Sequence, residues 1–600
     1  MRKMRVEKRT LKRQSGAHLP RSPYRDFVRV KTERKGIGKL KVIFILLIAL
    51  LQLCLLAFFH YALTEVFRGY LIFSVVLDII TCFYILGSSK NGRSKPVWIM
   101  LVLVLFPVGF LVYLLSDERI FFRSSRKRYA AILQSSAGML TGCGTGGLGK
   151  STMHAANYMV NTTGFVPYKN TRAKYYPSGA SAFDDMLIDC AGARKFIFIE
   201  YFIIAEGALY SRLFSVLEER AAAGVDVRVI YDDMGSSGRI SRKALKKARS
   251  AGIRMYAFNK LVPLYKIGMN YRDHRKITVV DGELAYTGGI NISDEYVNEK
   301  RLYGYWKDNA VRVEGDAVQS FTLMFLRQWE FVTRKPFDYA PFLYAGGAKF
   351  PAPLSGRGSP AEADCALPAE VTAGGEADVQ PRGAGAVTIV SEAERLAAGM
   401  APPQAEEKKE ADVQSAGEEH GGVFIPYAAG LEFPDPVVRD VYAGAISQAN
   451  ERVWIMTPYF VPDETITNLL ASKARSGADV RIVLPGVPDK AFVYLVSLDN
   501  ADKLTKSGVK VYTMADSFVH TKSVLTENCA IIGSANFDLR SFFQQYENAL
   551  YTDDKAVMRG LERDFEDTFP ECVQRGFIDG KPGPLRALLT AILQIFAPMM

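Results

Sequence analysis

The chain has 600 residues, with 75 Lys or Arg against 63 Asp or Glu, and a formal net charge of +12 at pH 7. A single hydrophobic core rarely serves so many residues, so the length predicts several domains and excludes a small one-domain module. The seven cysteines form no C-x-x-C pair, which argues against a disulfide framework and against a cysteine zinc site.

The positive charge is concentrated in an N-terminal tail. Residues 1–41 contain fifteen basic and three acidic residues, so this tail alone carries a net charge equal to that of the whole chain. Basic tails bind nucleic acid or anionic membrane surfaces. Because residues 42–63 follow without a charged side chain and are long enough to cross a bilayer, we expect anionic lipid as the partner and no nucleic acid.

Two more apolar segments follow, residues 69–87 and 97–115. We therefore predict a multi-pass anchor in the cell membrane over residues 42–115, with two or three transmembrane segments. Basic residues flank the anchor at both ends, so the positive-inside rule leaves the side of the membrane open. The basic residues after the anchor are Arg119, Arg123, Arg126, Lys127 and Arg128.

Residues 116–160 are predicted to be a linker. They contain a literal G-x-x-x-x-G-K-S match at Gly144, Gly149, Lys150 and Ser151. A phosphate-binding loop requires a strand before the first glycine and a helix after the lysine. The preceding letters QSSAGMLTGC are poor strand formers, so a flexible linker is favoured and a nucleotide-binding loop is the alternative.

Strand and helix patterns then alternate in two similar series, over residues 161–345 and 425–578. Strands are expected at 195–204, 225–233 and 253–259, and again at 452–461, 478–485 and 509–514. Helices are expected at 213–224 and 243–252, and again at 469–477 and 501–508. The order predicts an α/β fold of two halves, each with a parallel sheet segment.

The stretch between the halves has a different composition. Residues 351–423 contain no Phe, Tyr or Trp and are rich in Ala, Gly, Pro and Glu. Such a composition buries too little apolar surface to offset its ordering entropy. We predict a disordered insertion over residues 346–424 and a C-terminal tail over residues 579–600.

One short pattern occurs twice, a His-x-Lys followed five residues later by a carboxylate. The chain has only six histidines, and each copy continues into a small-residue turn that ends in Asn. A single His-x-Lys is usually a solvated strand face, but the duplication favours catalysis. The candidate residues are His274, Lys276, Asp281 and Asn291 in the first copy, and His520, Lys522, Glu527 and Asn536 in the second.

The spacing suggests a role for each member. Alternate residues of a strand share a face, so the His and the Lys of each copy should point together. Asp281 precedes Gly282 between two apolar runs, which predicts a tight hairpin. The two carboxylates are therefore interpreted as supports of the catalytic strands, a task that Glu527 can also fulfil.

Together the two copies supply a nucleophile, an acid and two cations, a set that suits attack on a phosphodiester. One neutral His would form a phosphohistidine while the other protonates the leaving alkoxide. Lys276, Lys522 and the amides of Asn291 and Asn536 would hold the phosphoryl charge, without a metal or other cofactor. Asp308 and Glu547 are candidates to orient the two imidazoles, with simple ion pairs as the alternative.

These motifs resemble the phospholipase D superfamily, whose signature is H-x-K-x-x-x-x-D twice, each followed by Gly-Gly/Ser-x-Asn. The chain is similar above all to bacterial cardiolipin synthases, over about residues 69–345 and 425–575. Glu527 departs from the signature. The text that carries the resemblance is NYRDHRKITVVDGELAYTGGINISDEY at 270–296, TPYFVPDE at 457–464, GSANFDLRSF at 533–542 and the apolar segment 98–113.

The resemblance implies two phospholipase D-like α/β halves packed as a pseudo-dimer, preceded by N-terminal transmembrane helices. It also implies condensation of two phosphatidylglycerol molecules to cardiolipin and glycerol, with His274 as nucleophile and His520 as general acid, or the reverse. The alternatives are a hydrolase or a transferase with another acceptor alcohol, a membrane-tethered nuclease, and an inactive lipid-binding scaffold. Nothing in the sequence predicts an oligomeric state.

Overall fold

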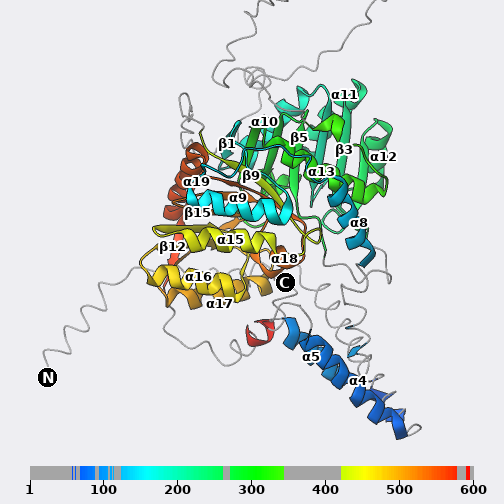
Figure 1. The fold of residues 1–600 in the computed structure, drawn as a ribbon, viewed down its shortest axis with the longest axis vertical. Helices are drawn as coiled ribbons and strands as arrows, with labels where there is room; N and C mark the ends of the chain where they lie inside the picture. Colours follow the sequence, from blue (N-terminus) through cyan, green and yellow to red (C-terminus); the bar gives the residue numbers. More distant parts are fainter. Residues whose placement is uncertain are drawn as a thin grey trace, which may run out of the picture. The chain divides into compact units, whose positions relative to one another are not determined.

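The computed structural model describes residues 123–260, 271–343 and 421–576, together with 68–87, 94–105, 590–594 and a few positions between 54 and 113. The chain divides into two compact units, Met1–Asp117 and Glu118–Met600, and each is described by itself. Figure 1 traces the elements of both units along the chain.

The first unit contains two apolar helices, α4 (Arg68–Leu86) and α5 (Ser94–Val104). Ile85, Val102 and Tyr113 form a small buried cluster between them, and the rings of Trp98 and Tyr113 meet edge to face at 5.3 Å. Among the described residues, no helix combines the length and apolarity needed to cross a bilayer. The predicted span at 42–63 lies almost entirely outside the described residues, and the transmembrane anchor stays a prediction.

The first half of the second unit is built on a seven-stranded sheet in the order β1-β8-β6-β5-β2-β3-β4. Strands β2, β3 and β4 are parallel, and β5 joins β2 antiparallel. The strands are β1 (Thr171–Tyr176), β2 (Phe196–Tyr201), β3 (Asp226–Asp232), β4 (Arg254–Phe258), β5 (Lys276–Val280), β6 (Leu284–Gly288) and β8 (Ala310–Gly315), and the helices are α10 (Gly179–Ala191), α11 (Ala208–Ala222), α12 (Arg242–Ser250) and α13 (Val318–Thr333).

The second half repeats this plan on an eight-stranded sheet in the order β19-β13-β12-β10-β15-β16-β18-β9. Strands β10, β12 and β13 are parallel, and β15 joins β10 antiparallel. The strands are β9 (Phe424–Ala429), β10 (Arg452–Met456), β12 (Asp479–Pro485), β13 (Lys510–Met514), β15 (Ser523–Thr526), β16 (Ala530–Gly533), β18 (Glu547–Thr552) and β19 (Cys572–Arg575), and the helices are α15 (Val437–Gln448), α16 (Glu464–Arg475), α17 (Ala491–Thr505), α18 (Leu539–Phe543) and α19 (Lys555–Thr568).

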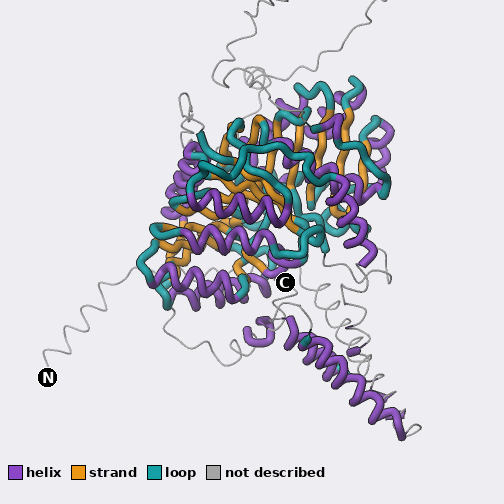
Figure 2. Tube along the Cα trace, in the orientation of Figure 1, coloured by secondary structure: helices purple, strands orange, loops and turns teal. Residues whose placement is uncertain are grey.

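Helices cover both sheets, as the tube in Figure 2 shows. All six residues of β2 are buried, which explains why a continuous apolar run, and not an alternating one, marks the central parallel strands. The predicted α/β fold with two repeated parallel segments is confirmed.

The two halves also share backbone pairs. Strand β14 (Ser517–Val519) of the second half pairs parallel with β7 (Tyr305–Lys307) of the first. Asp273 forms a parallel bridge with Tyr546, and Tyr168 an antiparallel one with Phe424. The predicted packing of two halves as a pseudo-dimer is therefore confirmed as an interlocked pair.

The predicted linker at 116–160 is corrected, because residues in it form α8 (Arg123–Ser135) and most of α9 (Lys150–Thr163). Helix α9 buries Thr152, Ala156, Met159 and Thr163, a helical spacing, and packs on α15. The Gly-rich segment before α9 favoured a linker in the sequence, although the apolar residues of α9 recur with helical spacing. No strand occurs in the described residues 139–149, so a nucleotide-binding loop lacks the strand that it needs before Gly144.

The predicted insertion and tail are described only at their edges. Residues 344–420 lie outside the described residues, whereas Phe424 is buried and begins β9. In the predicted tail, residues 590–594 are helical, and Gln594 Nε2 donates to Asp499 Oδ2 (2.9 Å) and Asn500 Oδ1 (2.8 Å) of α17. This short helix therefore packs on the second half.

If α9 belongs to the core, Met159→Ala should lower the free energy of unfolding of the second unit by about 2 to 5 kcal/mol. The reason is the loss of a fully buried side chain between α9 and its neighbours. Chemical unfolding of the whole chain in detergent measures the change. Asn157→Ala, on the exposed side of the same helix, is the control and should change the stability by no more than about 0.5 kcal/mol. Equal effects of the two substitutions would restore the linker interpretation.

Candidate active site

Each histidine of the duplicated pattern contacts a carboxylate of the other half. His274 Nδ1 lies 3.0 Å from both Oε1 and Oε2 of Glu547, and His520 Nδ1 lies 2.7 Å from Asp308 Oδ2. Because an ionised carboxylate only accepts, each imidazole is set to donate through Nδ1 and to present Nε2 to a substrate. Both predicted orienting acids are present, and they are exchanged between the halves.

The backbone explains the exchange. The His274 N–H donates to the carbonyl of Tyr546, the residue before Glu547 (2.8 Å). The His520 N–H donates to the carbonyl of Lys307, the residue before Asp308 (2.7 Å). The same parallel pairing thus occurs twice, and each time it sets an imidazole beside the acid of the opposite half.

The histidines lie just before the strands and not on them. Strand β5 begins at Lys276, and β15 begins after Lys522, so strand alternation is not what joins each His to its Lys. The lysines fold back instead. Lys276 Nζ donates to the His274 carbonyl (2.6 Å), and Lys522 Nζ donates to the His520 carbonyl and lies 2.8 Å from His520 Nδ1.

Burial makes both lysines easier to deprotonate. It lowers the pKa of Lys276 to about 8, against an opposing effect of Glu547 and Asp308. It lowers the pKa of Lys522 to about 7, against an opposing effect of Asp308. Both side chains are almost fully buried, so a desolvated ammonium here is a strong partner for an anion.

The two imidazoles are neutral in the free site. Burial, followed by Lys276 and Lys522, lowers the pKa of His274 well below its usual range. Burial and Lys522 lower the pKa of His520 to about 3, although Asp308 acts in the opposite direction. A neutral imidazole has the free Nε2 lone pair that a nucleophile or a base requires.

The two acids differ from each other. Burial raises the pKa of Glu547 to about 7, and Lys276 opposes this. Burial also tends to raise the pKa of Asp308, but His520 and Lys522 outweigh it and leave the pKa below its ordinary value. Asp308 is thus the more firmly ionised of the two.

The two predicted asparagines also lie at the site, in different states. Asn291 Oδ1 accepts from the Ile203 N–H (3.0 Å), and its Nδ2 is buried without a hydrogen bond to a described residue. Asn536 Nδ2 donates to Asp538 Oδ2 (3.2 Å). Burial raises the pKa of the Tyr296 phenol and the Asn291 amide opposes this, but the amide makes no close hydrogen bond to a described residue. It is therefore the more weakly held donor of the two amides.

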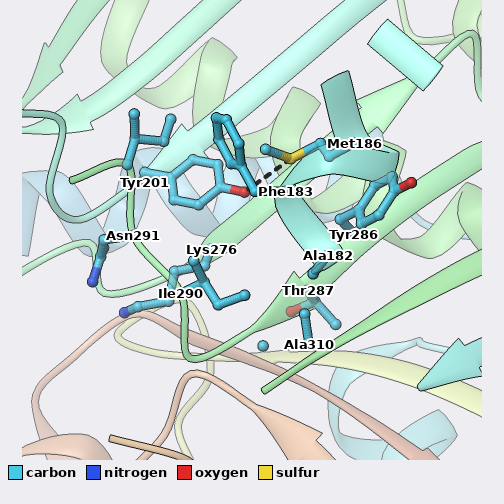
Figure 3. Close-up of a pocket in the computed structure, with 12 residues that line it drawn as sticks. Ala182, Phe183, Met186, Tyr201, Lys276, Tyr286, Thr287, Ile290, Asn291 and Ala310 are labelled. Atoms are coloured by element: carbon cyan, nitrogen blue, oxygen red, sulfur yellow. Dashed lines mark hydrogen bonds between the residues drawn. The ribbon is translucent and has the colours of Figure 1, made fainter. Parts of the chain in front are cut away.

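Figure 3 shows Asn291 and Lys276 at one side of an otherwise mainly apolar pocket. The cavity within this pocket has a volume of about 20 Å³. Its walls come from α10, the ends of β2 and β8, strands β5 and β6, and the turn that follows β6. The lining includes Phe183, Met186, Tyr201, Tyr286 and Ile290. The low polarity of this wall helps to explain why the Lys276 ammonium is desolvated.

The predicted hairpin is confirmed, and it fixes the place of Asp281. Strands β5 and β6 pair antiparallel with Val280 opposite Leu284, and Asp281 and Gly282 turn the chain with φ of 55° and 72°. The Asp281 carboxylate accepts from the N–H groups of Arg194 (2.7 Å), Lys195 (2.7 Å) and Phe196 (2.8 Å). It lies at the far end of β5 from Lys276 and holds the start of β2.

Glu527 has the same task in the second half. Its carboxylate accepts from the N–H groups of Asn450 (2.6 Å) and Arg452 (3.3 Å), at the start of β10. Asn528 Nδ2 donates to it as well (3.1 Å). The departure from the aspartate of the signature is therefore a change in how a strand is held.

Other residues hold the site although the sequence analysis did not single them out. Ser534 Oγ donates to Glu547. The serine in the GSAN turn is the sequence feature from which this contact could have been predicted. At the matching position a side chain on Gly289 would collide with Asp308, 1.9 Å from Oδ1. Phe202 lies edge-on to His274 at 5.0 Å, and Tyr296 edge-on to His520 at 5.2 Å.

Arg275, between His274 and Lys276, is a further residue of this kind. It forms a buried ion pair with Glu432 of the second half, and its Nε donates to the Glu547 carbonyl (3.3 Å). Glu200 lies 3.7 Å from its guanidinium. Arg275 therefore fixes the backbone of the acid that His274 contacts. Among the described residues, no group of three or more His, Cys, Asp and Glu is arranged to hold a metal.

Comparison with known proteins agrees with this geometry. The family model described as "Cardiolipin synthase, PLD-like domain" matches residues 187–329 and 442–569, and one described as "Phospholipase D-nuclease N-terminal" matches residues 76–116. Each of the two segments of the first match contains one His-Lys pair and one of the exchanged acids.

Relatives extend over most of the chain. An uncharacterized protein of Streptococcus mutans is 31% identical over 75% of this chain and 83% of its own length. Cardiolipin synthase 2 of Staphylococcus epidermidis is 29% identical over 82% of this chain and 90% of its own length. The solved structure of phosphatidylserine synthase from Haemophilus influenzae covers 75% of this chain and 99% of its own, with 13% identity and a TM-score of 0.49.

If Glu527 only holds β10, Glu527→Asp should keep the rate of the site near that of the wild type, because the shorter carboxylate still reaches the strand start. Glu527→Ala should lower the free energy of unfolding by about 1 to 3 kcal/mol, since backbone N–H groups lose their acceptor. Steady-state rates and chemical unfolding measure the two effects. A loss of rate in Glu527→Asp with unchanged stability would give this carboxylate a chemical role.

Proposed function

Because the chain belongs to the cardiolipin synthase family of phospholipase D-like enzymes, we propose that it condenses two phosphatidylglycerol molecules to cardiolipin and glycerol. Phosphatidyl transfer between phospholipids is the activity of this family. The observation that carries the proposal is the exchanged pair of His-carboxylate contacts around two buried lysines. This arrangement supplies two imidazoles, each in contact with a carboxylate. A two-step transfer requires two such groups, one as the nucleophile and one as the acid and base.

In the first proposed step, His274 Nε2 attacks the phosphorus of one phosphatidylglycerol. The N–P bond forms, the bond from phosphorus to the glycerol oxygen breaks, and His520 gives the leaving oxygen a proton. Lys276, Lys522 and the amide of Asn291 hold the phosphoryl oxygens while negative charge develops on them.

In the second step, neutral His520 takes the proton from a glycerol hydroxyl of another phosphatidylglycerol. The hydroxyl oxygen attacks phosphorus, the N–P bond breaks, and cardiolipin leaves with His274 neutral again. The proton that His520 takes from the acceptor hydroxyl replaces the one that it gave to the leaving glycerol in the first step.

The electrostatics support this order of roles. A bound phosphodiester anion offsets the two ammonium groups that lower the pKa of His520, so the imidazolium becomes accessible only with substrate present. Asp308, with its lowered pKa, stays ionised and stabilises that imidazolium. Glu547, with a pKa raised to about 7, is a weaker partner for a charged ring, which suits a His274 that acts as a neutral nucleophile.

We also propose that the chain is a multi-pass protein of the bacterial cell membrane. The apolar segments at 42–63, 69–87 and 97–115 support this, as does the match of residues 76–116 to a phospholipase D-nuclease N-terminal family. The basic tail then lies against anionic lipid, worth about 1 kcal/mol per basic residue near the surface.

The product of the reaction tests the proposal. Purified full-length protein in detergent should convert phosphatidylglycerol to cardiolipin and an equimolar amount of glycerol, and His274→Ala and His520→Ala should both abolish this. Phosphatidate in place of cardiolipin would identify a hydrolase. Cleavage of DNA without lipid turnover would identify a nuclease, and no turnover of either would leave a scaffold.

An activated substrate separates the two histidines. A phosphodiester with a p-nitrophenyl leaving group needs no proton for departure, so His520→Ala should still release a burst of p-nitrophenolate, whereas His274→Ala should not. Stopped-flow absorbance measures the burst. A burst in His274→Ala and none in His520→Ala would reverse the assigned roles.

The pKa values predict how the rate depends on pH. The ammonium forms bind the phosphodiester, and they are lost as pH rises through the lowered values of about 7 for Lys522 and about 8 for Lys276. Since kcat/KM reports the free enzyme, it should fall above pH 7. Lys522→Arg should move this fall to higher pH, because a guanidinium stays charged. If kcat/KM of the wild-type enzyme stayed constant between about pH 6 and 9, the proposal that Lys276 and Lys522 bind the phosphodiester as ammonium groups would be wrong.

A further inference from the structure

Three segments near the histidines each carry an exposed apolar side chain. Met234 follows β3, Leu302 precedes β7, and Phe492 lies in the first turn of α17. Their exposed fractions are 43%, 49% and 62%. Large apolar side chains gathered on one surface are unusual in a soluble unit and indicate an interaction site. We call the segments 233–240, 298–304 and 486–492 the rim.

The rim lies directly over the aromatic walls of the site. A side chain on Gly235 would come within 2.9 Å of the Phe202 ring, and Phe202 contacts His274. Tyr303, next to Leu302, contacts Trp306 and Phe518, which lie 5.2 and 5.9 Å from His520. A single aromatic ring therefore separates segment 233–240 from His274, and one ring likewise lies between Tyr303 and His520.

The three segments form one surface. Arg239 pairs with Glu295 at 3.0 Å, just before segment 298–304. The N–H of Val487 donates to the Ser517 carbonyl (3.0 Å), and Ser517 pairs with Tyr305, the residue that follows segment 298–304. Burial raises the pKa of Tyr303, Asp489 raises it further, and Arg239 lowers it, so charges from both other segments act on one phenol.

Basic side chains accompany the apolar ones. Lys300 and Arg301 are exposed beside Leu302, and Lys490, two residues before Phe492, has a side chain that is 60% exposed. The Lys490 ammonium lies 4.0 Å from Asp489, a carboxylate that also accepts from the Tyr459 hydroxyl (2.5 Å). Exposed apolar side chains next to cations suit an anionic lipid surface, where the first enter the acyl boundary and the second contact phosphates.

We propose that the rim is the face by which the catalytic unit docks on an anionic bilayer, so that lipid head groups enter the site between its three segments. This inference rests on the proposed function, which requires two lipid substrates. His274 and His520 are 7% and 8% exposed, so a phosphate reaches them only by leaving the plane of the bilayer. A docked rim keeps the acyl chains covered while this occurs.

Fluorescence quenching tests the contact directly. Phe492→Trp in the full chain, reconstituted in phosphatidylglycerol nanodiscs, should be quenched by lipids that carry bromine on their acyl chains, after subtraction of the four native tryptophans. Ile188→Trp is the matched control. Ile188 is 63% exposed and lies near the end of α10. This end of α10 is close to Arg194, whose N–H donates to Asp281 at the hairpin, far from the rim. A tryptophan at position 188 should therefore stay unquenched. Equal quenching of both, or of neither, would overturn the proposal.

A rate ratio tests its consequence. In a Leu302→Ser, Phe492→Ser double variant, the ratio of turnover on vesicle phosphatidylglycerol to turnover on water-soluble dihexanoyl-phosphatidylglycerol should fall about tenfold, whereas Ile188→Ser should leave the ratio unchanged. An unchanged ratio in the double variant would overturn the docking role. A wild type that turns over neither lipid would refute the proposed function instead, and the quenching result would still decide whether the rim meets the membrane.

Discussion

The exchange of carboxylates between the halves is the contact on which the rest of the molecule depends. Glu547 lies against His274 and Asp308 against His520, so neither half contains a complete site. The backbone pairs of Asp273 with Tyr546 and of β14 with β7 exist at the positions that bring each acid to its imidazole. If the two halves met only through apolar surface, one half could slide along the other. These backbone pairs fix the register between the halves.

Two copies of one motif acquire different properties through their surroundings. His274 is flanked by Asp273 and Arg275, whose ion pair with Glu432 and contact with the Glu547 carbonyl create a buried charged network. His520 is flanked by Val519 and Thr521 at the same positions. Burial of charge is costly unless it is paired, so the network stiffens the His274 side. The two acids differ as well: burial raises the pKa of Glu547, whereas His520 and Lys522 outweigh burial and lower the pKa of Asp308.

Sequence reasoning succeeded where the signal was local. The apolar runs located β2 and β10, and the Asp281-Gly282 pair located the hairpin, because burial and turn geometry act within a few residues. It located Asp308 and Glu547 as acids near the motif but not their exchange, which is a tertiary fact. It missed the roles of Arg275 and Ser534 and the existence of helix α9. The sequence around Arg275 does not show which distant residues it contacts, and the Gly-rich run before α9 favoured a linker.

Glu527 shows what the trailing carboxylate of the motif does. Asp281 accepts from three successive N–H groups at the start of β2, and Glu527 from those of Asn450 and Arg452 at the start of β10. Strand β2 pairs with β5, and β10 pairs with β15. Strands β5 and β15 are the ones that follow His274 and His520. The carboxylate therefore fixes the register of the strand that follows each histidine. What this position requires is an acceptor that reaches the start of the neighbouring strand, and a glutamate meets that requirement as an aspartate does.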